Sequence, residues 1–203
     1  MDDSRIKGYL GTSNLVGVRI DKDNGPPDDR RPPKKKRFCQ IVKEATEGSS
    51  CIFDADDLDC PNAMIALGFQ EPSFIEIETR IDPADTKSVE VAPLNEMESP
   101  DVVLIILNPM QLMMIGNRMG IIEAKFKGDM AVCGEATASV YMNKKPNMSP
   151  LCGGARKYAK YKDSELIFGA PLQYFKDLDE KIATMPVKDK VASKLKKFKI
   201  FGG

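Results

Sequence analysis

Residues 100–115 read PDVVLIILNPMQLMMI, and this stretch decides how the chain is expected to fold. Val102–Leu107 is an uninterrupted apolar run, which indicates a strand that is buried on both faces. Asn108-Pro109 is a typical helix start, because proline is tolerated at the first helical position. The spacing then predicts a helix to about Met119, with Met113 among the residues that face inward.

Outward from this stretch, short strand and helix patterns alternate along the chain. Residues 74–81, FIEIETRI, show the clearest alternation of apolar and polar residues and are a predicted strand. Residues 22–36 combine four prolines with dense charge, which predicts an exposed loop. Further strands are predicted at 14–21, 49–53, 89–92, 121–126 and 166–168. Further helices are predicted at 39–47, 61–67, 153–159 and 171–182. A basic amphipathic helix is predicted at about 188–199. The predicted fold class is α+β.

Composition narrows the functional classes. The 203 residues carry 30 basic and 30 acidic side chains, and the pI is about 6.4, so no general attraction to nucleic acid or anionic lipid is expected. No apolar run is long enough for a membrane span, and residues 1–11 lack the layout of a signal peptide. We expect a cytoplasmic protein whose partner is a larger protein assembly or a second copy of the chain. The basic run RRPPKKKR at 30–37 is either a solvated loop or a docking element.

Five cysteines and no histidine make thiols the only soft ligands and the strongest nucleophiles of the chain. Four of them form two similarly spaced pairs, Cys39/Cys60 and Cys133/Cys152, with separations of 21 and 19 positions, and Cys51 is left over. Each of the four stands where a helix is predicted to begin, and the unpaired N–H groups and dipole of such a helix end stabilise a thiolate. Cytoplasmic cysteines bind metals, act in redox chemistry or are simply buried more often than they form disulfide frameworks.

The segments around the two cysteine pairs share an order of elements. In each, an apolar strand precedes a cysteine that starts a helix, and a Cys-Pro or Cys-Gly dipeptide opens the next helix. This order predicts one domain over residues 1–203 with two pseudo-repeated halves, about 14–95 and 96–185, mixed sheets and short helices that begin at cysteines. Residue identity between the halves is slight, so the repeat rests on order and spacing. A pseudo-two-fold axis between such halves would bring the two cysteine pairs together.

Four converging thiolates can bind a zinc ion or an iron–sulfur cluster, most simply of the 4Fe-4S type. The spacing is unusual for either, because compact sites take two ligands from one C-x₂-C loop, whereas no two of these four cysteines are closer than 19 positions. Three other interpretations stay open. The thiols can be buried apolar residues, line a metal-free pocket for an anion or small molecule, or act in redox chemistry with activation by Glu44, Glu135 or Arg156.

Three segments of the chain resemble, in order, the signatures of an uncharacterised archaeal and bacterial family known as domain of unknown function 169. They are FCQIVKEATEG with DADDLDCPNAMIALGF, then PDVVLIILNPMQLMMI, then VCGEATASV with MSPLCGGARKYAKYKDSELIFGAPL. The resemblance extends over about residues 14–185. It marks as family-pattern positions Cys39, Cys60, Cys133, Cys152, Arg156 and Pro171. Cys51 does not fit the pattern, and Ala155 stands where the family more often has an acidic residue.

The sequence therefore predicts a cytoplasmic thiolate-ligated metal or iron–sulfur protein with a role in electron transfer, cluster handling or an accessory function. The predicted ligands are Cys39, Cys60, Cys133 and Cys152, and Arg156 is the predicted cofactor-binding cation. The family resemblance supports this choice of residues but implies no reaction.

Overall fold

One antiparallel sheet of six strands organises the computed structural model, which describes residues 1–72, 77, 79–125 and 132–185. The order across the sheet is β2-β3-β1-β4-β6-β5, and all neighbouring strands are antiparallel. The strands are β1 (Val16–Asp21), β2 (Cys51–Phe53), β3 (Ser88–Pro93), β4 (Val102–Leu107), β5 (Asn147–Ser149) and β6 (Leu166–Ala170). The predicted α+β class is confirmed, with one difference: a single antiparallel sheet replaces the mixed sheets that the sequence predicts.

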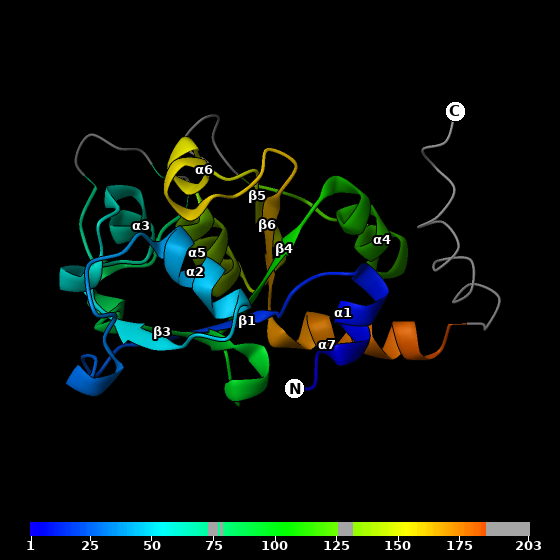
Figure 1. Ribbon diagram of the computed structural model, residues 1–203, viewed down its shortest axis with the longest axis horizontal. Helices are drawn as coiled ribbons and strands as arrows, with labels where there is room; N and C mark the ends of the chain where they lie inside the picture. The colour runs from blue at the N-terminus through cyan, green and yellow to red at the C-terminus, as the bar shows by residue number, and fades with distance from the viewer. Residues whose placement is uncertain (73–76, 78, 126–131, 186–203) are drawn as a thin grey trace.

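Helices cover both faces of the sheet. They are α1 (Ser4–Leu10), α2 (Phe38–Thr46), α3 (Pro61–Ala66), α4 (Pro109–Met119), α5 (Cys133–Asn143), α6 (Gly153–Ala159) and α7 (Leu172–Ala183). Helices α2, α3, α5 and α6 pack into one apolar core, core A, and helices α1, α4 and α7 pack into a second, core B. Figure 1 shows the first group in the left half of the molecule and the second group in the right half.

Strand β4 is buried on both faces, as its sequence predicts. Its side chains alternate between the two cores because successive residues of a strand point to opposite faces. Those in core A are Val102, Leu104 and Ile106, and those in core B are Val103, Ile105 and Leu107. None is more than 8% exposed, and each such burial contributes about 1.5–3 kcal/mol. This strand joins the helices on the two sides into one molecule.

The strand order is symmetric about the β1–β4 pair, where Gly17 lies opposite Val103. Outward from the centre, the first half supplies β1, β3 and β2, and the second supplies β4, β6 and β5. The helix contacts follow the same rule, since α2 packs on α6 and α3 packs on α5. The predicted pseudo-repeat requires this arrangement, and the duplication itself stays a prediction.

Two local predictions are wrong. Residues 121–125 of the predicted strand 121–126 form no strand, and Ile121 is 95% exposed. The Asn147 side chain instead bonds the backbone of Lys125 on both sides, accepting from its N–H (2.7 Å) and donating to its carbonyl oxygen (3.0 Å). In α4, Met113 is 53% exposed, so the inward face of this helix is narrower than its apolar residues suggest.

Other predictions lie outside the described residues. They include the basic helix at about 188–199 and half of the predicted strand 74–81, whose described residues 77 and 79–81 are not in a strand. Conversely, α1 and β5 were not predicted from the sequence.

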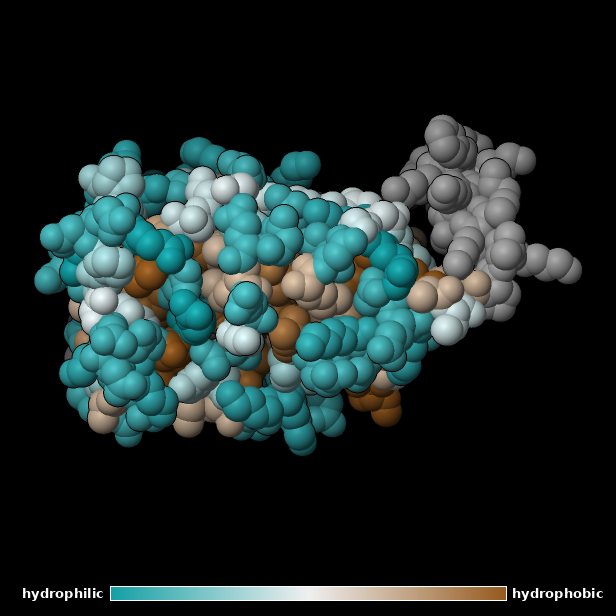
Figure 2. Space-filling view, turned by 90° about the horizontal axis from the view of Figure 1, so that it is seen from below, coloured by the Kyte–Doolittle hydropathy of each residue, from teal (hydrophilic) through white to brown (hydrophobic). Residues whose placement is uncertain are grey.

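The described part of the chain contains no helix with the length and apolar character that a membrane crossing requires. Seen from below, the described surface is mostly hydrophilic, and hydrophobic residues show mainly in narrow gaps (Figure 2).

Candidate functional site

All four predicted site cysteines lie at helix starts in core A. Cys39 is the second residue of α2 and Cys133 the first of α5, while Cys60 and Cys152 occupy the N-cap positions of α3 and α6. Pro61 follows Cys60 at the first helical position, where its missing N–H costs no hydrogen bond. Each thiol therefore stands beside backbone N–H groups that have no partner within their own helix.

The structure brings these four cysteines together. The Cys133 thiol forms a hydrogen bond with the sulfur of Cys39, and the charges of Cys60 and Cys152 also act on Cys133. Cys60 in turn is subject to the charges of Cys39 and Cys152. Each half of the sequence therefore contributes one pair of thiols to this neighbourhood, and the prediction that the four form one metal site stays a prediction.

The hydrogen bond between Cys39 and Cys133 sets which sulfur ionises first. It lowers the pKa of Cys39, whose thiolate accepts the bond, with further help from the Arg37 cation and the Gln40 N–H against the effect of burial. The same hydrogen bond, together with burial, raises the pKa of Cys133 well above its ordinary value. The pair titrates as one unit, in which the first negative charge resides on Cys39.

Access to the site is from the side of Cys60 and Cys152, which are partly exposed, whereas Cys39 and Cys133 are buried. Burial is the main cause that raises the pKa of Cys60, and the nearby N–H of Ala63 acts in the opposite sense. The site thus has a deep pair of thiols that share a hydrogen bond and an outer pair toward solvent.

Arg37 is a candidate site residue that sequence reasoning missed. Its guanidinium lies 4.0 Å from the centroid of the Tyr158 ring, and its charge stabilises the thiolates of both Cys39 and Cys60. Gly154 lies beside both groups, because a Cβ there would be 3.7 Å from Arg37 Nη1 and 3.5 Å from the Cys152 sulfur, which are ordinary contact distances. The sequence does place a cation close to this cysteine, because Arg37 ends the basic run 30–37 and stands two residues before Cys39.

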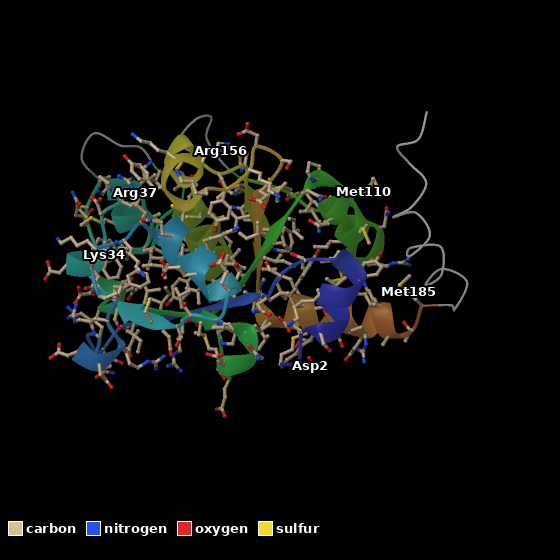
Figure 3. The ribbon with its side chains drawn as sticks, viewed as in Figure 1. Asp2, Lys34, Arg37, Met110, Arg156 and Met185 are labelled. Atoms are coloured by element: carbon tan, nitrogen blue, oxygen red, sulfur yellow. The ribbon has the colours of Figure 1, made fainter. Side chains whose placement is uncertain are left out.

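The predicted cation Arg156 lies at the same end of the molecule as Arg37 (Figure 3). Its guanidinium donates to the carbonyl oxygens of Leu151 (2.5 Å) and Pro150 (3.1 Å) and to the Asp163 carboxylate (2.7 Å). Leu151, directly before Cys152, has a φ of 70°, a conformation that is unfavourable for a branched side chain. Arg156 therefore holds the strained turn that positions Cys152. Its predicted contact with a cofactor stays a prediction.

Tyr161 supports the buried side of the site. Its hydroxyl donates to the carbonyl oxygen of Cys39 (3.1 Å), and burial, with the charges of Cys133 and Cys39, raises its pKa far above the physiological range. The phenol is therefore a permanent neutral donor that fixes the first turn of α2.

Cys51 and Glu44 lie elsewhere, at a separate cavity of about 190 Å³ beside β2. Burial raises the pKa of Cys51 to about 11, and Glu44 forms an ion pair with Lys36 (2.5 Å). The structure therefore separates Cys51 from the other four cysteines. Glu135, the other predicted activating carboxylate, is 2% exposed in the first turn of α5, two residues after Cys133.

The described residues contain no group of three or more Cys, Asp or Glu side chains arranged to hold a single metal ion. A tetrahedral zinc site with Zn–S bonds of about 2.3 Å requires sulfur atoms roughly 3.8 Å apart. The four thiols of the described structure are not arranged in this way. A cluster places its own iron and sulfide atoms between the ligands, so it needs a wider arrangement of thiolates.

Comparisons with known proteins agree with the segments described above. The family model of domain of unknown function 169, described as "Uncharacterised ArCR", matches residues 12–80 and 73–181. An uncharacterized protein of Methanocaldococcus jannaschii is 35% identical over an alignment of 179 residues, and the match covers 73% of this chain and 77% of that protein. No solved structure matches the chain.

Proposed function

The chain belongs to the family of domain of unknown function 169, and we propose that it is a cytoplasmic protein that binds an iron–sulfur cluster or a zinc ion through Cys39, Cys60, Cys133 and Cys152. The role that suits such a site is electron transfer, cluster handling or an accessory function in a larger assembly.

The observation that carries this proposal is the convergence of four thiols from four separate helix starts. Four thiolates and one zinc ion carry a net charge of −2, and such charge in a core is costly unless it is compensated. Helix N-termini supply partial positive charge, and Arg37 supplies a full one. An apolar role for the four residues does not require these features.

A cluster and a single zinc ion differ in the thiol spacing that they need, because a cluster spans a wider gap than a mononuclear ion. A thiol proton lies in the hydrogen bond between the deep pair, Cys39 and Cys133, and it must leave when a metal binds, because the thiolate is the ligand form. We therefore expect metal loading to release protons and to weaken at low pH.

The test is anaerobic purification of the full chain from a host that builds clusters, followed by iron, sulfide and zinc analysis and a visible spectrum. Iron and sulfide with a broad brown absorbance indicate a cluster, and one zinc per chain without colour indicates a zinc site. Each of the four cysteine-to-serine changes should abolish loading, whereas the matched control Cys51→Ser should load normally. A colourless, metal-free protein with four alkylatable thiols contradicts the proposal.

A second candidate function is thiol–disulfide chemistry, which the direct hydrogen bond between Cys39 and Cys133 favours. The Cys39 thiolate would attack a disulfide partner, the partner would leave as a thiolate, and Cys133 would then attack Cys39 to release the second partner thiol. Two electrons and two protons pass to the partner, and one Cys39–Cys133 disulfide forms. A metal-free protein that reduces a small disulfide, and loses that activity in Cys39→Ser but not in Cys60→Ser, supports this candidate instead.

A further inference from the structure

A second polar cavity lies where β4 runs into α4, apart from the cysteines. Its volume is about 250 Å³, and its walls come from the turn after α1, from α2, from the start of α4 and from the turn before β6. Hydrogen bonds between these elements fix the walls. Thr12 Oγ1 donates to the Ile106 carbonyl oxygen (3.0 Å), and Gln111 Nε2 donates to the Leu10 carbonyl oxygen (3.0 Å). The cavity is therefore held open by contacts between segments that are far apart in the sequence.

Two lysines and one carboxylate line this cavity. Lys43 reaches it from α2 and Lys162 from the turn before β6. Neither ammonium group forms an ion pair with any residue that the structure describes. The Lys43 ammonium group instead lies over the face of the Tyr161 ring, 5.2 Å from the ring centroid. Glu165 is held in place by the backbone N–H of Lys162 (2.8 Å). The lining thus has an excess of one positive charge.

We propose that this cavity binds a small organic anion, a carboxylate or phosphate compound that also carries a hydroxyl or amino group. Lys43 and Lys162 hold the anionic group, and Glu165 accepts a hydrogen bond from the hydroxyl or amino group of the same ligand. Uncompensated ammonium groups in a concave site attract anions more strongly than they do on an open surface, because the local dielectric is lower. The volume lies just below the usual range of about 300–1,000 Å³ for ligand pockets, which restricts the ligand to a small compound.

Tyr161 connects the cavity to the cysteine site, since its ring lies against Lys43 and its hydroxyl bonds the Cys39 carbonyl oxygen. Binding of the anion nevertheless requires no metal at the cysteine site, because none of the residues that line the cavity is a cysteine. The two proposals can therefore fail or succeed independently.

The test is isothermal titration of the full chain with inorganic phosphate and, separately, with lactate, at constant ionic strength set by sodium chloride. We expect saturable binding of at least one probe at one site per chain, and the responding probe identifies the anionic group. Lys43→Gln and Lys162→Gln should each weaken binding by about fivefold, and Glu165→Gln should strengthen the binding of phosphate. The control Lys176→Gln, an exposed position on α7 outside the cavity, should change nothing.

Circular dichroism verifies that each variant is folded. Absence of saturable binding for both probes overturns the proposal, as does unchanged binding in both Lys43→Gln and Lys162→Gln.

Discussion

Gly154 keeps the space beside Cys152 open, and replacing it with alanine tests whether that space receives a cofactor. The new Cβ would lie 3.5 Å from the Cys152 sulfur and 3.7 Å from Arg37 Nη1, which are ordinary van der Waals distances. The neighbouring Gly153 provides a matched control in the same helix, because nothing lies within 4 Å of its Cβ position. Alanine therefore fits at both positions in the metal-free chain, but only at position 154 does its methyl group project into the cysteine site.

In the metal-free chain both substitutions should stabilise the fold. Alanine restricts the unfolded chain more than glycine does, which raises the free energy of unfolding by about 0.4–1 kcal/mol. For a domain of this size the gain corresponds to a rise in Tm of about 1–4 °C. In the loaded chain the two variants should differ. The methyl group of Gly154→Ala takes up volume next to a ligand sulfur, so metal content per chain should fall by about half or more, while Gly153→Ala should load like the wild type.

The assay combines thermal unfolding of the metal-free proteins with metal analysis after anaerobic purification. Full loading of Gly154→Ala refutes the reasoning, since the methyl group would then project into space that no cofactor uses. An equal loss of metal in both glycine variants also refutes it, because the effect would then arise from helix α6 and not from the site.

Three further predictions follow from single contacts. Arg37→Gln should raise the pKa of Cys39, because the Arg37 cation is one of the groups that lower it. The pH profile of Cys39 alkylation in the metal-free chain should therefore shift to higher pH. An unchanged profile would show that Arg37 does not act on the thiolate. Tyr161→Phe removes a buried donor to the Cys39 carbonyl oxygen and should lower the free energy of unfolding by about 1–1.5 kcal/mol in urea titrations, whereas no loss would mean that another donor replaces it. Burial raises the pKa of Cys51 from 9.0 to about 11, so the folded state favours the neutral thiol. The stability that the neutral thiol contributes is complete below pH 9 and is lost as the pH rises from 9 to 11. Between those pH values the wild type should lose about 1–2 kcal/mol relative to Cys51→Ser, and parallel curves for the two proteins would contradict the raised pKa.

Those parts of the fold that depend on local pattern could be predicted from the sequence. The apolar run of β4 and the proline starts of α3 and α4 were assigned correctly, because burial on both faces and the missing proline N–H leave direct traces in residue order. Residues 121–125 show the limit of such reasoning. They have a strand-like composition, but the backbone of Lys125 bonds with the side chain of Asn147 and finds no strand partner.

The place of the four cysteines at helix starts was predictable, but their electrostatic environment was not. A cysteine at a helix start can be recognised from a following proline or glycine, as at Cys60 and Cys152. Arg37 stabilises the thiolates, whereas Arg156 holds the turn before Cys152. This difference depends on the direction in which each long side chain points, which the sequence does not reveal. The hydrogen bond between Cys39 and Cys133 likewise depends on the packing of α2 beside α5, which no local pattern encodes.

Native mass spectrometry of the anaerobically purified full chain tests the central claim most directly. We predict that the wild type and Cys51→Ser carry one added mass, that of a single iron–sulfur cluster or of one zinc ion. Serine at position 39, 60, 133 or 152 should leave the mass of the bare chain. A bare wild-type chain, or the same added mass in all five cysteine variants, would contradict a site formed by these four thiols.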